Sequence, residues 1–403
     1  MLSLALSLLL LPLSFAQDSV HRDIGTYGID DPKGSPFQTF QSNPSQPPQL
    51  QINSNSSGLA PGYVFIAVGG QPTSLQRQPV IYDMSEERMG TMVWSGNYSD
   101  AFDFRTQTYQ GEPVLTFWAG TPYNGWGDGS FYILNASYVE IAKFDAVGYV
   151  GQGDLHEFTI TPNDTAMVLI YPVVPADLTP VGGAAEGGYI FDSIFQEVNI
   201  STGELIFEWK SSDHIPLNES YNLLNGRGAQ DAPYDYFHIN SADKDADGNY
   251  LISARTMDCI YKINGTDGSV IWHLGGKLND FDLAGDAKFA LQHDARWISR
   301  ETQDRMTLFD NGPTENVTYS RGLLLAVDQD AMTVRLIQEF ENTQRTFGTF
   351  QGSLQAINPS DPNTNFMIGY GSEPYFAEFD SDGNELLNVQ FGESRVLISS
   401  ERN

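Results

Sequence analysis

Three histidines and one arginine are the residues of this chain best suited to chemistry. His156, His238 and His293 each begin a short run of strand-like sequence, and Arg255 closes the run that follows His238. Imidazole can act as nucleophile, general acid and general base near neutral pH. The planar guanidinium of arginine binds oxyanions such as sulfate and phosphate. This set of residue types therefore indicates chemistry on an oxyanionic group.

A loosely repeated unit of four short strands positions these residues. The strands alternate with turns rich in Asn, Asp and Gly, which supply the positive φ that tight hairpins require. Six such units fit between Gln49 and Phe391 at a spacing of roughly 45 to 80 residues, a pattern typical of a β-propeller. We therefore predict an all-β fold, a six-bladed β-propeller with a short N-terminal arm. Two packed β-sandwiches are the alternative, but they do not explain the repeated strand order.

The predicted strands follow one another in the same order in each unit. Second strands are predicted at 64–68, 114–118, 167–171, 250–254, 306–309 and 366–370. Third strands include 194–198, 260–263 and 375–379, and fourth strands include 205–209, 270–274 and 334–337. The extra length at 172–188 and 211–233 is predicted to form long loops on one face, where such loops commonly shape a pocket.

The first strand of a propeller blade lines the central channel. His156, His238 and His293 stand at the first strands of three consecutive units, so we predict that they converge at one end of that channel, with Arg255 near them. One such histidine would more often be an ordinary polar channel residue, but three in a repeated position favour a functional site. A three-histidine zinc site is the competing interpretation. The charge of Arg255 disfavours a dication beside it, so we predict no metal and no other cofactor.

Composition supports one large domain, which we assign to residues 49–403. The 403 residues are 40% hydrophobic and 12% aromatic, which is enough for a full core. The formal net charge of −30 argues against nucleic acid as a partner, because nothing would neutralise its phosphates. An anionic substrate would need a local cationic pocket. Cys259 is the only cysteine, so the core must supply stability without an intrachain disulfide, and we predict that Cys259 is buried.

The N-terminus is typical of the secretory route. Residues 1–16 combine an apolar core with a small-x-small cleavage site and are predicted to be a signal peptide, followed by an arm at 17–48. No later stretch is long and apolar enough to predict a transmembrane segment. We therefore expect a secreted or lumenal, N-glycosylated protein. The N-x-Ser/Thr acceptor sites are Asn55, Asn97, Asn135, Asn163, Asn199, Asn218, Asn264 and Asn316.

Residues Asp243 to Gly248 resemble a calcium-binding loop of the D-x-D-x-D-G type. The twelfth position of that loop is Ala254, so the bidentate glutamate of an EF-hand is missing. The segment also lies between two predicted strands of one unit. We therefore favour a polar hairpin turn, with a calcium site as the alternative.

The stretch from 236 to 312 resembles the arylsulfate sulfotransferases (arylsulfotransferases, ASST). His238 and Asn240 followed by Ser253-Ala254-Arg255 form one matching motif. Gln292-His293 followed by Phe309-Asp310-Asn311-Gly312 form the other. The resemblance extends more weakly over most of residues 60–391 and looks closest to the secreted fungal branch of the family.

This resemblance implies a six-bladed propeller with a central funnel and a PAPS-independent aryl sulfotransferase. A sulfuryl group would pass from an aryl sulfate to another phenol through a sulfohistidine. His293 would be the nucleophile, and His238, Arg255 and Asn240 would hold the sulfuryl oxygens. His156 would serve the phenol as acid or base. Arg296 and Ser353 are further candidates for substrate binding.

Two other functions stay open at this point. An aryl sulfate hydrolase would pass the sulfuryl group to water. A non-catalytic secreted propeller would bind a glycan or a protein through loops such as 123–126 and 221–224.

Overall fold

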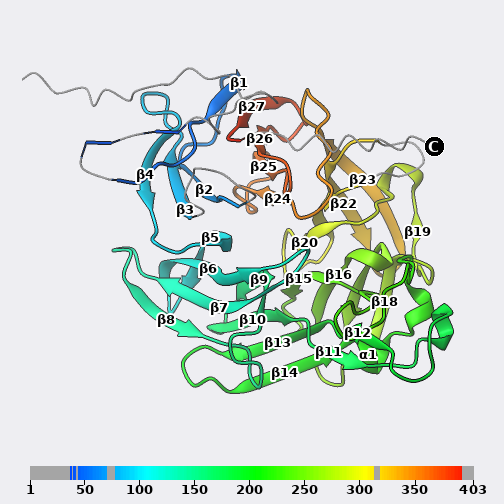
Figure 1. The fold of residues 1–403 in the computed structure, drawn as a ribbon. Coiled ribbons are helices and arrows are strands. Elements are labelled where there is room, and N and C mark those ends of the chain that lie inside the picture. Colours follow the sequence, from blue (N-terminus) through cyan, green and yellow to red (C-terminus); the bar gives the residue numbers. More distant parts are fainter. Residues whose placement is uncertain (1–36, 39, 42–43, 70–77, 313–317, 393–403) are drawn as a thin grey trace, which may run out of the picture.

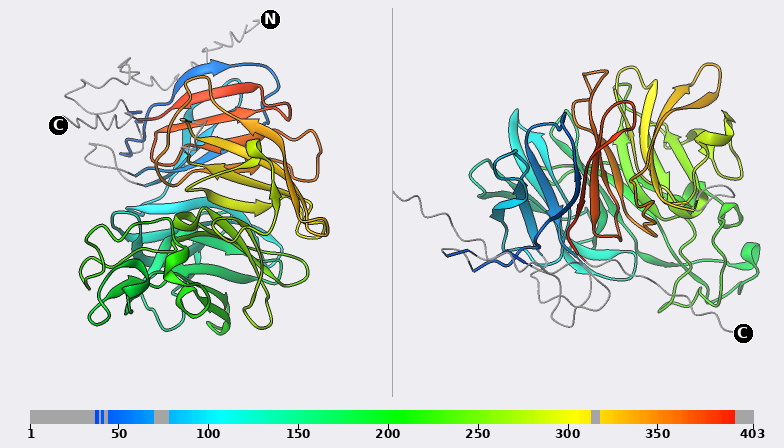
Figure 2. Two further views of the ribbon diagram at one scale, coloured as in Figure 1. Left: turned by 90° about the vertical axis from the view of Figure 1, so that its right-hand side faces the viewer. Right: turned by 90° about the horizontal axis from the view of Figure 1, so that it is seen from above.

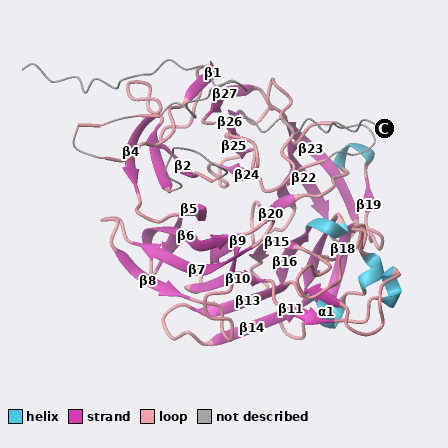
Figure 3. Cartoon of the chain, viewed as in Figure 1, coloured by secondary structure: helices cyan, strands magenta, loops and turns pink. Residues whose placement is uncertain are grey.

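The computed structural model describes residues 37–38, 40–41, 44–69, 78–312 and 318–392. Almost all regular structure in these residues is β-strand, as the magenta arrows of Figure 3 show. The predicted signal peptide, most of the arm at 17–48 and the acceptor site Asn316 lie outside the described residues.

The strands form antiparallel sheets of neighbours in sequence. A three-stranded sheet holds β2 (Tyr63–Ala67), β3 (Pro79–Asp83) and β4 (Thr91–Ser95). An eight-stranded sheet holds β5 (Ala101–Tyr109), β6 (Glu112–Pro122), β7 (Gly127–Leu134), β8 (Glu140–Phe144), β9 (Gly153–Ile160), β10 (Thr165–Ile170), β13 (Ile194–Asn199) and β14 (Leu205–Lys210). A bridge between Gly129 and Gly153 joins its two four-stranded halves.

Three further sheets continue the series. The first holds β15 (Ile239–Lys244), β16 (Tyr250–Ala254), β17 (Cys259–Ile263) and β18 (Val270–Gly275). The second holds β20 (His293–Trp297), β21 (Arg305–Asp310), β22 (Arg321–Asp328) and β23 (Thr333–Phe340), with β19 (Asp282–Leu283) added in parallel to β23. The third holds β24 (Ser353–Ala356), β25 (Phe366–Gly369), β26 (Tyr375–Phe379), β27 (Glu385–Gln390) and β1 (Gln51–Asn55).

These sheets follow one another around a common centre, so the protein is an all-β β-propeller (Figures 1 and 2). The predicted second strands from 114–118 onward lie at β6, β10, β16, β21 and β25, and each pairs between its predicted neighbours in sequence. The prediction for 64–68 was wrong in position. That segment overlaps β2, an edge strand, because within the described residues the preceding strand β1 pairs elsewhere.

Strand β1 closes the ring by pairing with the last strand of the propeller. It runs antiparallel to β27, from Gln51 opposite Gln390 to Asn55 opposite Leu387. Leu50, just before β1, packs in one hydrophobic cluster with residues of β2, β3 and β27. The first and last parts of the chain are therefore held together by backbone pairing and by a shared core.

Aromatic and aliphatic side chains fill the spaces between neighbouring sheets. The largest cluster joins β10 and β13 to β16 and β17, and it includes the fully buried Phe195 and Trp209. Cys259 lies in the same cluster, buried and unpaired, which confirms the prediction for the only cysteine. The stability of the domain therefore comes from packing.

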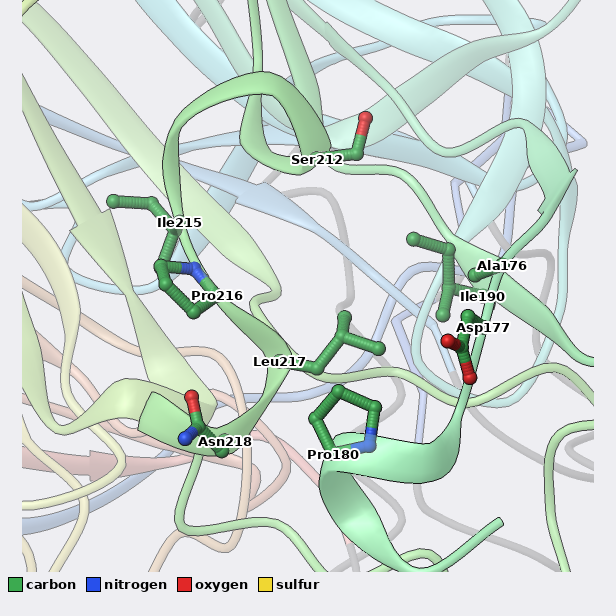
Figure 4. A pocket seen from close by; sticks show the side chains of 9 residues that line it. All are labelled: Ala176, Asp177, Pro180, Ile190, Ser212, Ile215, Pro216, Leu217 and Asn218. Carbon is green, nitrogen blue, oxygen red and sulfur yellow. The ribbon is translucent and has the colours of Figure 1, made fainter. Parts of the chain in front are cut away.

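The two long segments contain short elements of their own. They hold β11 (Val173–Pro175), η1 (Thr179–Val181), α1 (Ser211–His214) and η2 (Leu217–Glu219), and β12 (Tyr189–Phe191) directly follows the first of them. The other 3-10 turns are η3 (Arg255–Met257) and η4 (Gly285–Ala287). Just beyond the two segments, Ile190 and Tyr234 form a parallel bridge, and residues of both segments line an open cavity of about 430 Å³ (Figure 4). No histidine lines this cavity, so it is separate from the cluster described next.

The described part of the N-terminal arm lies on the three-stranded sheet. The side-chain amide of Gln38 donates to the carbonyl of Gly90 at 2.6 Å and accepts from the backbone N–H of Met92 at 3.1 Å. In the described residues no helix is long and apolar enough to cross a membrane.

Candidate functional site

The three predicted histidines come together, as their repeated position indicated. The ring centroids of His156 and His238 are 5.0 Å apart, and those of His156 and His293 are 6.2 Å apart. His156 lies within β9, His238 directly precedes β15, and His293 begins β20. All three side chains are largely shielded from solvent. Their predicted convergence is confirmed.

Irregular strand pairing turns these side chains toward one another. The register of β9 against β10 shifts between the partners of Val168 and Ile170, and β20 against β21 shifts between His293 and Arg296. A similar shift occurs in β15. His238 itself has a φ of 55°, which is uncommon for a residue with a Cβ. Bulges of this kind bend a strand and re-aim its side chains.

His293 is held in one tautomer by Asn311. The amide nitrogen of Asn311 donates to the carbonyls of Gly348 at 2.8 Å and Gln351 at 2.9 Å, so its oxygen faces His293. That oxygen lies 2.7 Å from Nδ1 of His293, which therefore carries the proton. Nε2 accepts the backbone N–H of Gln351 at 3.1 Å. The lone pair of this imidazole is thus on Nε2.

His293 is also kept neutral by its surroundings. Burial, followed by the charges of Arg255 and His156, holds the pKa of His293 well below its ordinary value, and the bond to Asn311 opposes this only in part. Burial and nearby positive charge both penalise an imidazolium. A neutral imidazole is the nucleophilic form of histidine, and in His293 the attacking lone pair is the one on Nε2 that accepts the N–H of Gln351.

The other two histidines contact carboxylates. Nδ1 of His156 lies 2.6 Å from Oδ1 of Asp154, and Nδ1 of His238 lies 2.7 Å from Oδ2 of Asp235. Burial alone would raise the pKa of Asp235, but His238, Arg255 and His156 hold it below its ordinary value. Asp235 is therefore a carboxylate at neutral pH, and it supports positive charge on its neighbours.

Arg255 supplies the nearby cation. It begins η3 directly after β16, and its backbone N–H donates to the carbonyl of His238 at 2.9 Å. One terminal nitrogen donates to the carbonyl of Thr349 at 3.0 Å. Its Nε is buried and has no hydrogen-bond partner among the described residues. A buried donor without a partner is costly, and a bound oxyanion would satisfy it.

Asn240 also borders the site. Its amide nitrogen donates to the carbonyl of Gln292 at 2.6 Å, which ties it to the residue before His293. Its amide oxygen is buried and has no partner within the described residues. The second N–H of the same amide is left for another acceptor.

Arg296 and Ser353 are placed differently. The guanidinium of Arg296 contacts Glu157 at 2.7 Å, Asp294 at 2.8 Å and the carbonyl of Ala242 at 2.7 Å. The N–H groups of Arg296 thus already donate to protein groups. The structure therefore gives no support to the predicted contact between Arg296 and substrate. Ser353 begins β24 opposite Gly369, and no hydrogen bond found in the described part of the chain joins it to a histidine.

Arg296 belongs to a buried ion-pair network that sequence reasoning missed. Glu157 lies at its centre and contacts Arg105 at 2.8 Å on one side and Arg296 on the other. The two arginines outweigh burial and lower the pKa of Glu157. Asp103, next to Arg105, has its pKa raised by burial to about 6. The sequence did contain a signal for this network. Charged residues stand at neighbouring positions of β5, β9 and β20, each the first strand of its four-stranded group.

The carboxylates of the calcium-like segment are directed toward protein cations. Asp243 pairs with Arg300 at 3.1 Å, and Asp245 lies 3.2 Å from Lys262. The segment connects β15 to β16 as a hairpin turn, as favoured from the sequence. Over the described ranges, no three His, Cys, Asp or Glu side chains are arranged to hold a metal ion.

An aromatic series leads from the surface to the histidines. Tyr123 and Trp126 stack at 4.3 Å in the hairpin between β6 and β7, and Trp126 contacts Phe191 at 5.2 Å. Phe191 in turn contacts Tyr171 at 6.4 Å, and Tyr171 stacks on His238 at 5.4 Å. Tyr123 is exposed, whereas Phe191 and Tyr171 are buried. One wall beside the histidines is therefore aromatic.

A comparison with known protein families identifies the family of this chain. Residues 105–392, more than half of the chain, match the family described as arylsulfotransferase (ASST). The chain belongs to the arylsulfotransferase family, and the resemblance seen in the sequence is confirmed at this level. The match starts in β5 and includes all of the histidines described above.

Similar solved structures are distant. A protein of unknown function from Bacteroides caccae shares 13% identity at a TM-score of 0.45, with 82% of this chain and 94% of that chain covered. The Dos1 propeller shares 12% identity at a TM-score of 0.35, with 87% and 76% covered. Sqt1 of Saccharomyces cerevisiae shares 13% identity at a TM-score of 0.38, with 85% and 73% covered. No curated protein matches the chain.

Proposed function

We propose that this protein is a PAPS-independent aryl sulfotransferase that moves a sulfuryl group from an aryl sulfate to another phenol through a sulfohistidine. The observation that carries the proposal is His293, a neutral imidazole with its lone pair on Nε2, beside Arg255, whose buried Nε has no hydrogen-bond partner among the described residues. A nucleophile and an oxyanion donor next to each other are what sulfuryl transfer requires. Membership of the arylsulfotransferase family supports the same reaction.

In the first step, Nε2 of His293 bonds to sulfur while the bond from sulfur to the phenol oxygen breaks. The electron pair of that bond goes to the phenol oxygen, which takes a proton from His156. In the second step, the acceptor phenol gives its proton to His156 and its oxygen bonds to sulfur. The electron pair of the sulfur–nitrogen bond then returns to His293.

The sulfuryl oxygens are held by Arg255, His238 and Asn240 in this proposal. Arg255 is the donor with an unsatisfied Nε, and Asn240 has an N–H to spare. Positive charge here favours an anion locally in a protein of net charge −30. The aromatic series that ends at Tyr171 gives a phenol ring a surface to stack on.

We also infer the wider setting of the enzyme from the chain. Four-strand groups beginning at β5, β9, β15, β20 and β24, with the sheet of β2–β4, support a propeller of six blades. None of the acceptor asparagines in the described residues is buried, which supports N-glycosylation. Together with residues 1–16, this supports a secreted or lumenal enzyme of the fungal-type branch.

The test is phenol release from a chromogenic aryl sulfate, with and without a second phenol. We expect release that the acceptor stimulates, and its loss in His293→Ala. His273→Ala is the matched control, because His273 lies in β18 and contacts Asp280, outside the cluster. Release that ignores the acceptor would identify a hydrolase. No release from any of several donors would refute the enzyme.

A further inference from the structure

The three clustered imidazoles differ in the chemical type of their Nδ1 partner. His156 and His238 contact the carboxylates of Asp154 and Asp235. His293 contacts the neutral amide oxygen of Asn311. A carboxylate stabilises an imidazolium, whereas an amide oxygen accepts the N–H without adding negative charge.

We propose that these Nδ1 partners determine which of the three imidazoles carry a second proton and which one stays neutral. Asp154 and Asp235 are positioning residues that hold His156 and His238 as proton-carrying groups. Asn311 is the positioning residue that holds His293 as a neutral nucleophile. The inference rests on the proposed sulfuryl transfer, which needs a protonated and an unprotonated imidazole side by side.

The charges that face each ring agree with this division. Arg255, His156 and His238 lie near His293 and lower its pKa, and its Nδ1 contacts two neutral oxygens, the amide oxygen of Asn311 and the carbonyl of Leu291. His238 is faced by Asp235 from its own segment, by His156 and Tyr171 from β9 and the end of β10, and by His293 from β20. Arg255 stands next to Asp235.

Asp154, one of the two carboxylate partners, is fixed in place. Oδ1 of Asp154 accepts the backbone N–H of His156 at 3.0 Å as well as the ring contact, and Oδ2 accepts the N–H of Gly127 at 2.9 Å. Asn311 is equally fixed by its two bonds to backbone carbonyls. Nδ1 of each ring is therefore directed at protein oxygens, with the carbonyl of Leu291 as a second partner for His293 at 3.1 Å. Nε2 is the atom that can meet substrate, and in His293 it exchanges the N–H of Gln351 for that contact.

Asp235→Asn is the most direct test. Oδ1 of Asp235 is buried and has no hydrogen-bond partner among the described residues, so the new amide group displaces no contact. The matched control is Asp280→Asn. Asp280 makes the same kind of contact to Nδ1 of His273, at 2.9 Å, in β18.

The first measurement is the proton NMR titration of the ring C–H groups, which is tractable because the chain has 6 histidines. In Asp235→Asn, we expect His238 to lose its proton at lower pH than in the wild type. In Asp280→Asn, His238 should titrate as in the wild type. An unchanged titration of His238 in Asp235→Asn overturns the inference.

The second measurement is kcat/KM for aryl sulfate as a function of pH. We expect Asp235→Asn to lose about tenfold or more at neutral and alkaline pH. The loss should shrink as the pH falls, because the variant ring then regains its proton. An equal loss at every pH would mean a merely structural role and would overturn the inference.

A variant in the opposite direction completes the design. Asn311→Asp gives His293 a carboxylate partner, so its loss of rate should be greatest in acid and smallest in alkali. It also removes two bonds to carbonyls, so its melting temperature is recorded alongside. A wild type that transfers no sulfuryl group would refute the proposed function, and the titrations alone would still decide this inference.

Discussion

Arg255 offers a hydrogen-bond donor that an incoming anion can accept without displacing a protein contact. Its terminal nitrogen is bound to the carbonyl of Thr349, while its Nε has no hydrogen-bond partner among the described residues. Its guanidinium can therefore keep one protein contact and still offer a donor. Lysine carries all its donors on one nitrogen, so it lacks the planar spacing that lets a guanidinium hold the carbonyl with one nitrogen and an anion with another.

We predict that Arg255→Ala lowers kcat/KM for aryl sulfates by about 100- to 1000-fold, the usual effect of losing one oxyanion donor. Arg255→Lys should recover only a small part of this loss. Steady-state kinetics with several donors measures both. Arg335→Ala is the control, because Arg335 forms an exposed pair with Asp282 and should change nothing. Full recovery by lysine would show that charge alone is needed.

Glu157 is a buried carboxylate whose charge is balanced by two arginines. It is fully shielded and lies between Arg105 and Arg296. We predict that Glu157→Ala lowers the free energy of unfolding by about 3–5 kcal/mol, because two guanidinium groups lose their shared partner. Denaturant unfolding measures this. Asp282→Ala, which removes the exposed partner of Arg335, should cost less than about 1 kcal/mol.

At the level of elements, strand order could be predicted but strand irregularity could not. Short apolar runs and Asn/Asp-Gly turns located β10, β16 and β25, because both patterns are local in sequence. The bulges depend on pairing with a neighbouring strand. The positive φ of His238 and of Asp294 therefore had no signal in the residues themselves.

The same contrast holds for the site. The three histidines were found because they recur in one position of the repeat. Their partners Asp154 and Asp235 come from nearby positions with no common spacing, two and three residues before the ring. Asn311 lies on the segment that follows β21, so only tertiary structure brings it to His293.

The contribution of ring closure by β1 to the free energy of unfolding can be measured. Leu50, just before β1, is buried in the cluster that it shares with β2, β3 and β27, whereas Ile52 on β1 is 37% exposed. We predict that Leu50→Ala lowers the free energy of unfolding by about 2–4 kcal/mol. Ile52→Ala should change it by less than about 1 kcal/mol. Equal effects in thermal or denaturant unfolding would mean that this cluster does not hold the closure.

At the scale of the whole molecule, we expect the free energy of unfolding to depend on pH. The folded state takes up a proton on Asp103 near pH 6, whereas an unfolded aspartate does so near 3.8. Between those values the folded state binds more protons, so stability rises as the pH falls. Glu157 and Asp235, whose pKa values are lowered, act in the opposite direction in more acidic solution, and the lowered pKa of His293 does so already below the ordinary histidine value of 6.5.

We therefore predict that Asp103→Asn makes stability fall more steeply than in the wild type as the pH drops from about 7 to 5, because proton uptake on Asp103 then no longer offsets the effect of His293. Melting temperatures of both proteins measured from pH 4 to 8 test this. Variant and wild-type curves that stay parallel over this range would contradict the prediction.

The pairing of β1 with β27 has a consequence for biosynthesis. Gln51 leaves the ribosome long before its partner Gln390, and at about 5–20 residues per second the wait is roughly 20 to 70 seconds. During translation β1 is an unpaired edge strand, the kind of segment that invites aggregation. Its sequence, Gln51-Ile52-Asn53-Ser54-Asn55, has a single apolar residue, which keeps the waiting strand soluble until the last sheet arrives.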